Sequence, residues 1–129
     1  MTNSLMIGKV IYQKLSESTK LTELLGNSIY PIIADNDAKF PFIVYKRNSI
    51  ISIGTKDGFG EDEVTYEVTV VSDKYPVSIE IANEVRKVLE KQRIQTDLMT
   101  LYNNKINGVT EEYDSNVYIQ KLIFNCRIN

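Results

Sequence analysis

Three short segments of the sequence carry side chains whose types and spacing could support chemistry. The first, Gly54–Asp62 (GTKDGFGED), combines three glycines with Lys56, as phosphate-binding loops do. Such a loop, however, ends in Gly-Lys-Ser/Thr and leads into a helix whose N-terminus holds the phosphate. Here the lysine precedes the later glycines, and a strand pattern follows. We therefore interpret this segment as a hairpin or interface loop. Phe59 at its tip either anchors a partner or packs back onto its own core.

The second segment, Asp35-Asn36-Asp37, resembles the start of a calcium-binding loop. A loop of that kind needs glycine at its sixth residue and glutamate at its twelfth. These positions hold Phe40 and Lys46. The sequence therefore favours a capped turn over a calcium site.

Acidic residues gather in two places, where they could hold a magnesium ion or form a solvated surface. The two groups are Asp57, Glu61, Asp62 and Glu63, and Glu111, Glu112 and Asp114. Neither group has a visible partner for acid–base catalysis, so we favour a surface role. The candidate protein-interface residues are Lys56, Asp57, Phe59, Glu61, Glu111, Glu112 and Asp114.

The side chains that most enzymes use are missing. The chain has no histidine, and Cys126 is its single cysteine. This excludes Ser-His-Asp and Cys-His catalysis, the usual zinc sites and an internal disulfide. Cys126 lies among apolar residues of a predicted strand, so we interpret it as a core residue. We predict no enzymatic activity, no cofactor and no metal site.

Composition places the chain among ordinary globular proteins. With 129 residues, 43% of them hydrophobic and 25% charged, we expect a single domain over residues 1–129. The net charge is −2 and no segment forms a basic stripe, so we expect no specific nucleic-acid binding. The apolar runs are too short to span a bilayer, and the N-terminus lacks the pattern of a signal peptide. We therefore expect a cytoplasmic protein without a membrane partner.

Periodicity predicts two main helices, over 4–15 and from Pro76 to about Gln92. A short helix over 21–25 would be capped by Thr19 and ended by Gly26.

Alternation predicts the strands. They are an edge strand over 29–33, then 42–47 extended to 53 after a break at 48–49, then 63–71, short pieces at 98–102 and 106–109, and 117–128. Glu111–Asn116 reads as a turn, and the last strand, apolar on both faces, as a central one. The predicted fold is α+β, an antiparallel or mixed β-sheet with two main helices packed on one face.

The order of local motifs resembles a family of small tail-completion proteins of long-tailed bacteriophages, also called tail terminators or tail-to-head joining proteins. The matching pieces are Ile11–Leu15, Leu21–Gly26, Ile29–Pro31, Phe40–Tyr45, Tyr66–Ser72 and Tyr75-Pro76. The resemblance covers most of the chain and weakens after about residue 92. The chain departs from the family in its Asn-rich segment 103–107, which bears on the C-terminal partner surface.

The resemblance implies an α+β subunit that assembles into a ring, typically a hexamer. Such a ring caps the tail tube and presents a surface to the head connector, so the implied partners are further copies of the chain, a tail-tube protein and a head-connector protein. It implies assembly in the bacterial cytoplasm and a place in the virion tail, without catalytic residues.

Two other functions stay open at this point. One is a small host-encoded protein-binding module without catalytic activity, which neighbouring genes would distinguish from a phage protein. The other is a metal-dependent nuclease, which would need the acids near Asp57 to converge with a second acidic cluster.

Overall fold

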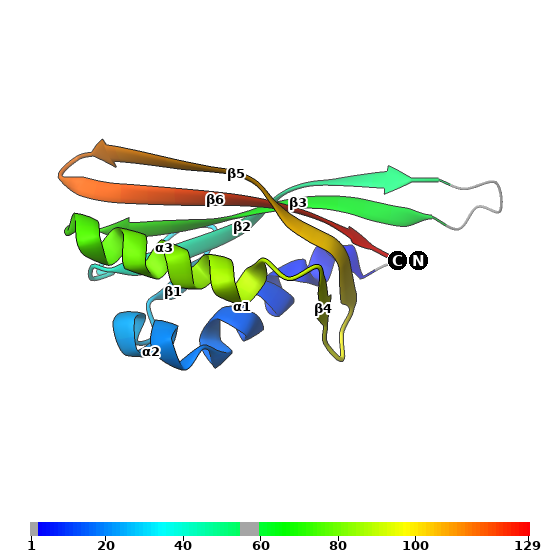
Figure 1. Ribbon diagram of the computed structural model, residues 1–129, viewed down its shortest axis with the longest axis horizontal. Coiled ribbons are helices and arrows are strands. Elements are labelled where there is room, and N and C mark those ends of the chain that lie inside the picture. Colours follow the sequence, from blue (N-terminus) through cyan, green and yellow to red (C-terminus); the bar gives the residue numbers. More distant parts are fainter. Residues whose placement is uncertain (1–2, 55–59) are drawn as a thin grey trace.

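In a computed structural model, the described residues, 3–54 and 60–129, form three α-helices and a six-stranded sheet (Figure 1). The elements in chain order are the 3₁₀ helix η1 (Ser4–Met6), α1 (Ile7–Glu17), α2 (Thr19–Leu25), β1 (Ile29–Pro31), β2 (Phe42–Ile53), β3 (Glu61–Ser72), α3 (Tyr75–Leu89), β4 (Arg93–Gln95), β5 (Thr100–Asp114) and β6 (Val117–Ile128).

The strands lie in the order β1-β2-β3-β6-β5-β4. The β1–β2 pair is parallel and the other pairs are antiparallel, so the sheet is mixed. It curls into a half-barrel, and the helices cover one of its faces (Figure 1). These features confirm the predicted α+β class. They also confirm β1 as an edge strand and β6 as a central one.

The core lies between the helices and that face of the sheet. Alternate residues of β3 point into it, which confirms the period-2 pattern of this strand: Val64, Tyr66, Val68 and Val70. From the helices come the predicted stripes of α1 and α3, including Ile7, Ile11, Leu15, Ile81, Val85 and Leu89. Burying each such side chain contributes about 1.5–3 kcal/mol. The opposite face of β6 is only half-buried, so this strand is covered on one side and not on both.

The short helix α2 begins one residue earlier than predicted. Its cap is Ser18, whose Oγ accepts a hydrogen bond from Leu21 N at 3.2 Å. Thr19, the predicted cap, is the first helical residue. Gly26 ends the helix as predicted, with a φ of 61° that favours glycine.

The C-terminal half differs most from the sequence prediction. The segments at 98–102 and 106–109 belong to one long strand, β5, which continues to Asp114. Glu111–Asn116 is therefore not a turn, because only Ser115 and Asn116 turn the chain, both with positive φ. Acidic residues have low strand propensity, but pairing with β6 decides their conformation here.

Two bulges bend β5. The register with β6 shifts between Tyr102 and Lys105 and again between Ile106 and Gly108. Figure 1 shows β5 turning toward β4 in this region. Because a bulge adds a residue to one strand only, it increases the local bend and twist.

A buried hydrogen-bond chain holds the first bulge. Tyr66 Oη donates to Asn104 Oδ1 at 2.8 Å, and Asn104 Nδ2 donates to the carbonyl of Leu89 at the end of α3. The ring of Tyr66 also stacks on Phe124, with centroids 5.1 Å apart. Asn104 is 3% exposed. Its amide, the Tyr66 hydroxyl and the Leu89 carbonyl therefore bond to one another in place of water. The chain thus ties β3, β5 and α3 together.

We expect Asn104→Ala to destabilise the fold. It leaves the Tyr66 hydroxyl and the Leu89 carbonyl buried without this partner, at a total cost of about 2–4 kcal/mol. Urea denaturation measures the loss in unfolding free energy. The matched control is Asn107→Ala, on the exposed part of the same strand, where we expect about 0.5 kcal/mol or less. Equal losses for the two variants would contradict the role of Asn104.

Candidate assembly surface

The outer edge of β5 is open along most of its length. Among the described residues, β4 pairs with β5 only from Thr100 to Tyr102, and the last contact on that side is Asn104 N to the carbonyl of Gln92, at 3.1 Å. Beyond it, Lys105–Asp114 pairs with β6 on the inner side only. We call this segment the β5 edge. From Gly108 onward it is regular and exposed, so it presents backbone hydrogen-bonding groups to a partner.

Three tyrosines cluster where this edge ends, at the tip of the β5–β6 hairpin. The Tyr113 and Tyr118 rings lie 4.9 Å apart, and the Tyr75 and Tyr118 rings 5.4 Å apart. Tyr113 is 59% exposed and Tyr75 41%. Tyrosine is one of the side chains most often responsible for affinity in protein interfaces. The cluster is therefore suited to binding another protein.

The predicted interface acids of the C-terminal half lie on the same strand as Tyr113. Glu111 accepts hydrogen bonds from Gln120 Nε2 at 2.9 Å and from the hydroxyl of Tyr75 at 3.2 Å. Glu112 and Asp114 are exposed. The three acids lie on one strand, but successive side chains alternate between its faces, so Glu111 points to the side of the tyrosines whereas Glu112 and Asp114 point to the other face. We call this surface the tyrosine tip; it comprises Tyr75, Tyr113, Tyr118, Glu111, Glu112 and Asp114.

The other predicted interface residues lie elsewhere. Glu61 begins β3 at the opposite end of the sheet from the tyrosine tip (Figure 1), and it accepts a 2.6 Å hydrogen bond from Arg127 Nη1. Lys56, Asp57 and Phe59 fall outside the described residues. Glu61 thus does not join the acids of the tip.

Sequence reasoning missed an apolar patch on the opposite edge of the sheet. Ile32 and Ile33, which follow β1, are 73% and 76% exposed. Ile32 has a φ of 67°, a strained conformation for a β-branched residue, and its N–H donates to the Tyr45 carbonyl at 2.8 Å. Exposed apolar side chains on strained backbone are typical of functional surfaces. The sequence did not predict this exposure, because Ile32 and Ile33 continue the apolar pattern of the preceding strand.

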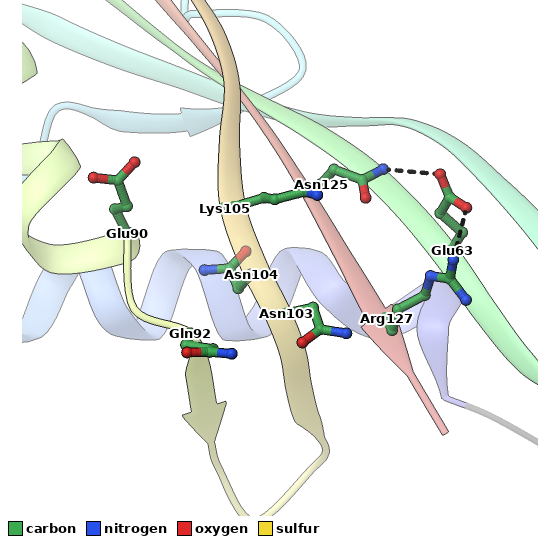
Figure 2. A pocket seen from close by; sticks show the side chains of 8 residues that line it. All are labelled: Glu63, Glu90, Gln92, Asn103, Asn104, Lys105, Asn125 and Arg127. Carbon is green, nitrogen blue, oxygen red and sulfur yellow. Dashed lines mark hydrogen bonds and ion pairs between the residues drawn. The ribbon is translucent and has the colours of Figure 1, made fainter.

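A polar hollow of about 530 Å³ lies over the first bulge of β5. Figure 2 shows Asn103, Asn104 and Lys105 on β5, between Glu90 and Gln92 on one side and a group from β3 and β6 on the other. In that group Glu63 accepts from Asn125 at 3.3 Å and pairs with Arg127 at 3.6 Å.

These two are the contacts seen between side chains that line the hollow among the described residues, since Asn104 bonds to Tyr66 and Leu89 and Glu90 pairs with Arg86 outside it. Within residues 3–54 and 60–129, no group of three or more Cys, Asp or Glu side chains is placed to hold a metal ion. None of the helices in those ranges is long and apolar enough to cross a membrane. Cys126 is buried, as predicted, and burial raises the pKa of its thiol to about 12.

Comparison with known proteins gives a match to a family model and matches to solved structures. The family model described as "Tail completion protein gp17" matches residues 9–128. A chain from the solved structure "Virion of native gene transfer agent (GTA) particle" shares the fold, with a TM-score of 0.80 and 15% identity. The alignment covers 92% of this chain and 90% of that one. No curated protein sequence matches.

We expect Glu111→Gln to change the titration of Tyr75. The hydrogen bond to Glu111, and then the negative charge of the same carboxylate, raise the pKa of Tyr75 above its ordinary value. Removing the charge should therefore lower that pKa. Ring-labelled tyrosine NMR measures it, with Tyr75→Phe identifying the signal and Glu112→Gln as the matched control. An unchanged Tyr75 titration in Glu111→Gln would show that the contact is not formed.

Proposed function

Because the chain belongs to the Tail completion protein gp17 family of phage structural tail proteins, we propose that it completes the tail by assembling into a ring that caps the tail tube. The family, together with the shared fold of a virion component, supports a part in a phage-like particle built with other structural proteins. The ring, its capping role and its joining to the head are our proposal.

The observation that supports assembly most directly is the β5 edge. Natural sheets protect long edges with a covering element, a short edge strand, bulges or charges. Here the bulges lie before Gly108, and the described part of the chain supplies no covering strand for the residues that follow. Charges protect only the far end of the edge, at Glu111, Glu112 and Asp114, and Gly108–Thr110 carries none. A strand added from another subunit would satisfy the open backbone groups. A protein that works in a multi-subunit particle can leave such an edge open because assembly covers it.

The tyrosine tip supports the same proposal. Its tyrosine rings can anchor a partner, and they lose little conformational entropy on binding. Its acids favour a partner whose surface is positively charged. We propose that Glu111, Glu112 and Asp114 act as interface residues in this way. Glu61 would serve a second contact at the other end of the sheet. Lys56, Asp57 and Phe59 lie outside the described residues, and we propose them as interface residues from the sequence alone.

We propose a tail-tube protein and a head-connector protein as the partners of the assembled ring. A ring between two different partners needs two different surfaces. The subunit offers the tyrosines with Glu111 on the side of the helices and, on the other face of the sheet, a hollow that Ile32, Ile33 and Glu112 line together. Assembly takes place in the bacterial cytoplasm on this proposal, and the protein acts through binding rather than catalysis.

Sizing of the purified chain tests the ring. We expect multi-angle light scattering to show discrete oligomers whose population rises with protein concentration, or on addition of the tail-tube protein. Negative-stain microscopy should then show closed rings. A chain that stays monomeric at all concentrations and does not bind assembled tubes would overturn the proposal.

A further inference from the structure

We propose that the free chain, before it meets other structural proteins, forms a symmetric dimer in which two β5 edges pair antiparallel, with Thr110 at the two-fold axis. The partner is thus a second copy of this chain, and the two sheets join into one continuous sheet. The inference goes beyond the ring proposed above, because a contact between identical edges closes at two copies. Such a dimer covers the β5 edge, which would otherwise be open to unwanted pairing.

The extent of the open edge defines the register of the pair. Three residues mark its two ends and its centre, here with their β6 partners: Lys105 with Asn125, Asp114 with Val117 and Thr110 with Lys121. On β6, the partner of Thr110 is midway between the other two. Levels are counted along β6, because the second bulge adds a residue to β5 on the Lys105 side. A two-fold axis at Thr110 therefore overlaps the two edges over their full length.

The backbone of β5 is compatible with this register. A two-residue turn follows Asp114, so Asp114 and Val117 flank it as a hydrogen-bonded pair. Because hydrogen-bonded and non-bonded pairs alternate along an antiparallel ladder, Val109 and Glu111 direct their backbone N–H and C=O groups away from β6. In the proposed dimer, Val109 of each copy lies opposite Glu111 of the other. The outward-directed groups of the two edges therefore meet.

The register also brings together charges that the single subunit leaves apart. Lys105 of one copy lies opposite Asp114 of the other and diagonal to its Glu112. All three pair with odd-numbered residues of β6, so they share the open face of the sheet. Across residues 3–54 and 60–129, neither Lys105 nor Glu112 makes a side-chain hydrogen bond or ion pair. Opposite charges on neighbouring strands stabilise a pairing, and the two-fold axis supplies this contact twice.

The Lys105 side chain can reach this position. Figure 2 shows it extending from β5 toward Asn125, and it is exposed. The flexible stem of a lysine lets its ammonium turn to the edge of the sheet.

The acids of the two copies do not lie directly opposite one another. Glu112 is opposite Gly108 of the other copy, and Glu111 is opposite Val109. The two copies of Glu111 are diagonal neighbours, but each carboxylate is held by hydrogen bonds within its own subunit. The register therefore avoids the direct like-charge contacts that destabilise a strand pair.

Exposed apolar side chains become covered on the helix side of the sheet. Val109 is 46% exposed and Tyr113 is 59% exposed. The two-fold axis places Tyr113 opposite Ile106 of the other copy and diagonal to its Val109, within reach of an aromatic ring. The helix α3 packs chiefly on β3 and β6, so it does not obstruct this contact. The dimer thus accounts for two apolar surfaces that the single subunit leaves in water.

Disulfide trapping with Thr110→Cys tests the pairing, because a residue at the two-fold axis meets its own copy. The Thr110 pair is non-hydrogen-bonded in this register, with Cα atoms about 4.5 Å apart, which suits a disulfide. We expect oxidised glutathione to convert most of this variant into covalent dimers. Cys126 is buried and protonated near neutral pH, so it should not react.

The matched control is Glu112→Cys, which is also exposed and lies on the same face of the same strand. Its two copies would be about 13 Å apart along the strands, which is too far for a disulfide. We therefore expect this variant to stay as single chains under the same oxidation.

A charge swap tests the same contact without cysteine. We expect Lys105→Glu to weaken dimerisation about tenfold in analytical ultracentrifugation, because it breaks two equivalent ion pairs. Adding Asp114→Lys to this variant should restore most of the affinity. Lys87→Glu, which changes an exposed lysine of α3, makes the same change in net charge and should leave the affinity unchanged. Thermal melting confirms that each variant is folded.

Two results would overturn the inference. Equal yields of covalent dimer from Glu112→Cys and Thr110→Cys would refute the register. An unmodified chain that light scattering finds monomeric at every concentration, together with no disulfide from Thr110→Cys, would refute the dimer itself. The ring is tested separately by adding the tail-tube protein, so failure of the dimer leaves the proposed function standing.

Discussion

The buried hydrogen-bond chain from Tyr66 through Asn104 to the Leu89 carbonyl is the constraint on which the rest of the structure depends. It holds a bulge of β5 against the end of α3 and the centre of β3. Before the bulge, β5 pairs with β4 and closes the core. After it, β5 follows β6 alone and becomes an open edge. One buried amide thus separates the part of the strand that builds the fold from the part that can meet a partner.

The charges on the open face of the sheet are balanced within the subunit. Glu67, 9% exposed, lies between Lys46 and Lys121 at 3.9 Å from each, and it accepts from Thr69 at 3.1 Å. Arg127 is similarly shared between Glu61 and Glu63. Because these charges are paired within the subunit, the face provides little electrostatic attraction for a charged partner. The tip acids and the β5 edge differ from it, because their exposed groups have more to gain from another chain.

The sequence predicted the elements whose pattern arises from the core. The helical stripes of α1 and α3, the alternation of β3 and the central place of β6 each follow from which residues must be buried. It did not predict β4, because Ile94 is the single apolar residue among its three. The sequence did not predict the bulges of β5 for a different reason. A bulge depends on the pairing register with the partner strand and not on the residues themselves.

The candidate site was predictable in part. The sequence predicts that Glu111, Glu112 and Asp114 lie on the surface, and they are exposed, but it predicts a turn for them because acidic residues have low strand propensity. Their neighbours Tyr75 and Tyr118 are distant in sequence, and only the fold brings them to Tyr113. Ile32 and Ile33 read as strand residues, since nothing in the sequence shows that the chain leaves β2 after Pro31 and exposes them.

Amide hydrogen exchange, compared between the monomeric and the assembled chain, tests the central claim most directly. If the open β5 edge is completed by a neighbouring copy, protection should rise on assembly in residues 105–114. The amides of β3 and β6, already paired on both sides, should change little. Exchange at the β5 edge that is as fast in the assembly as in the monomer would contradict the account.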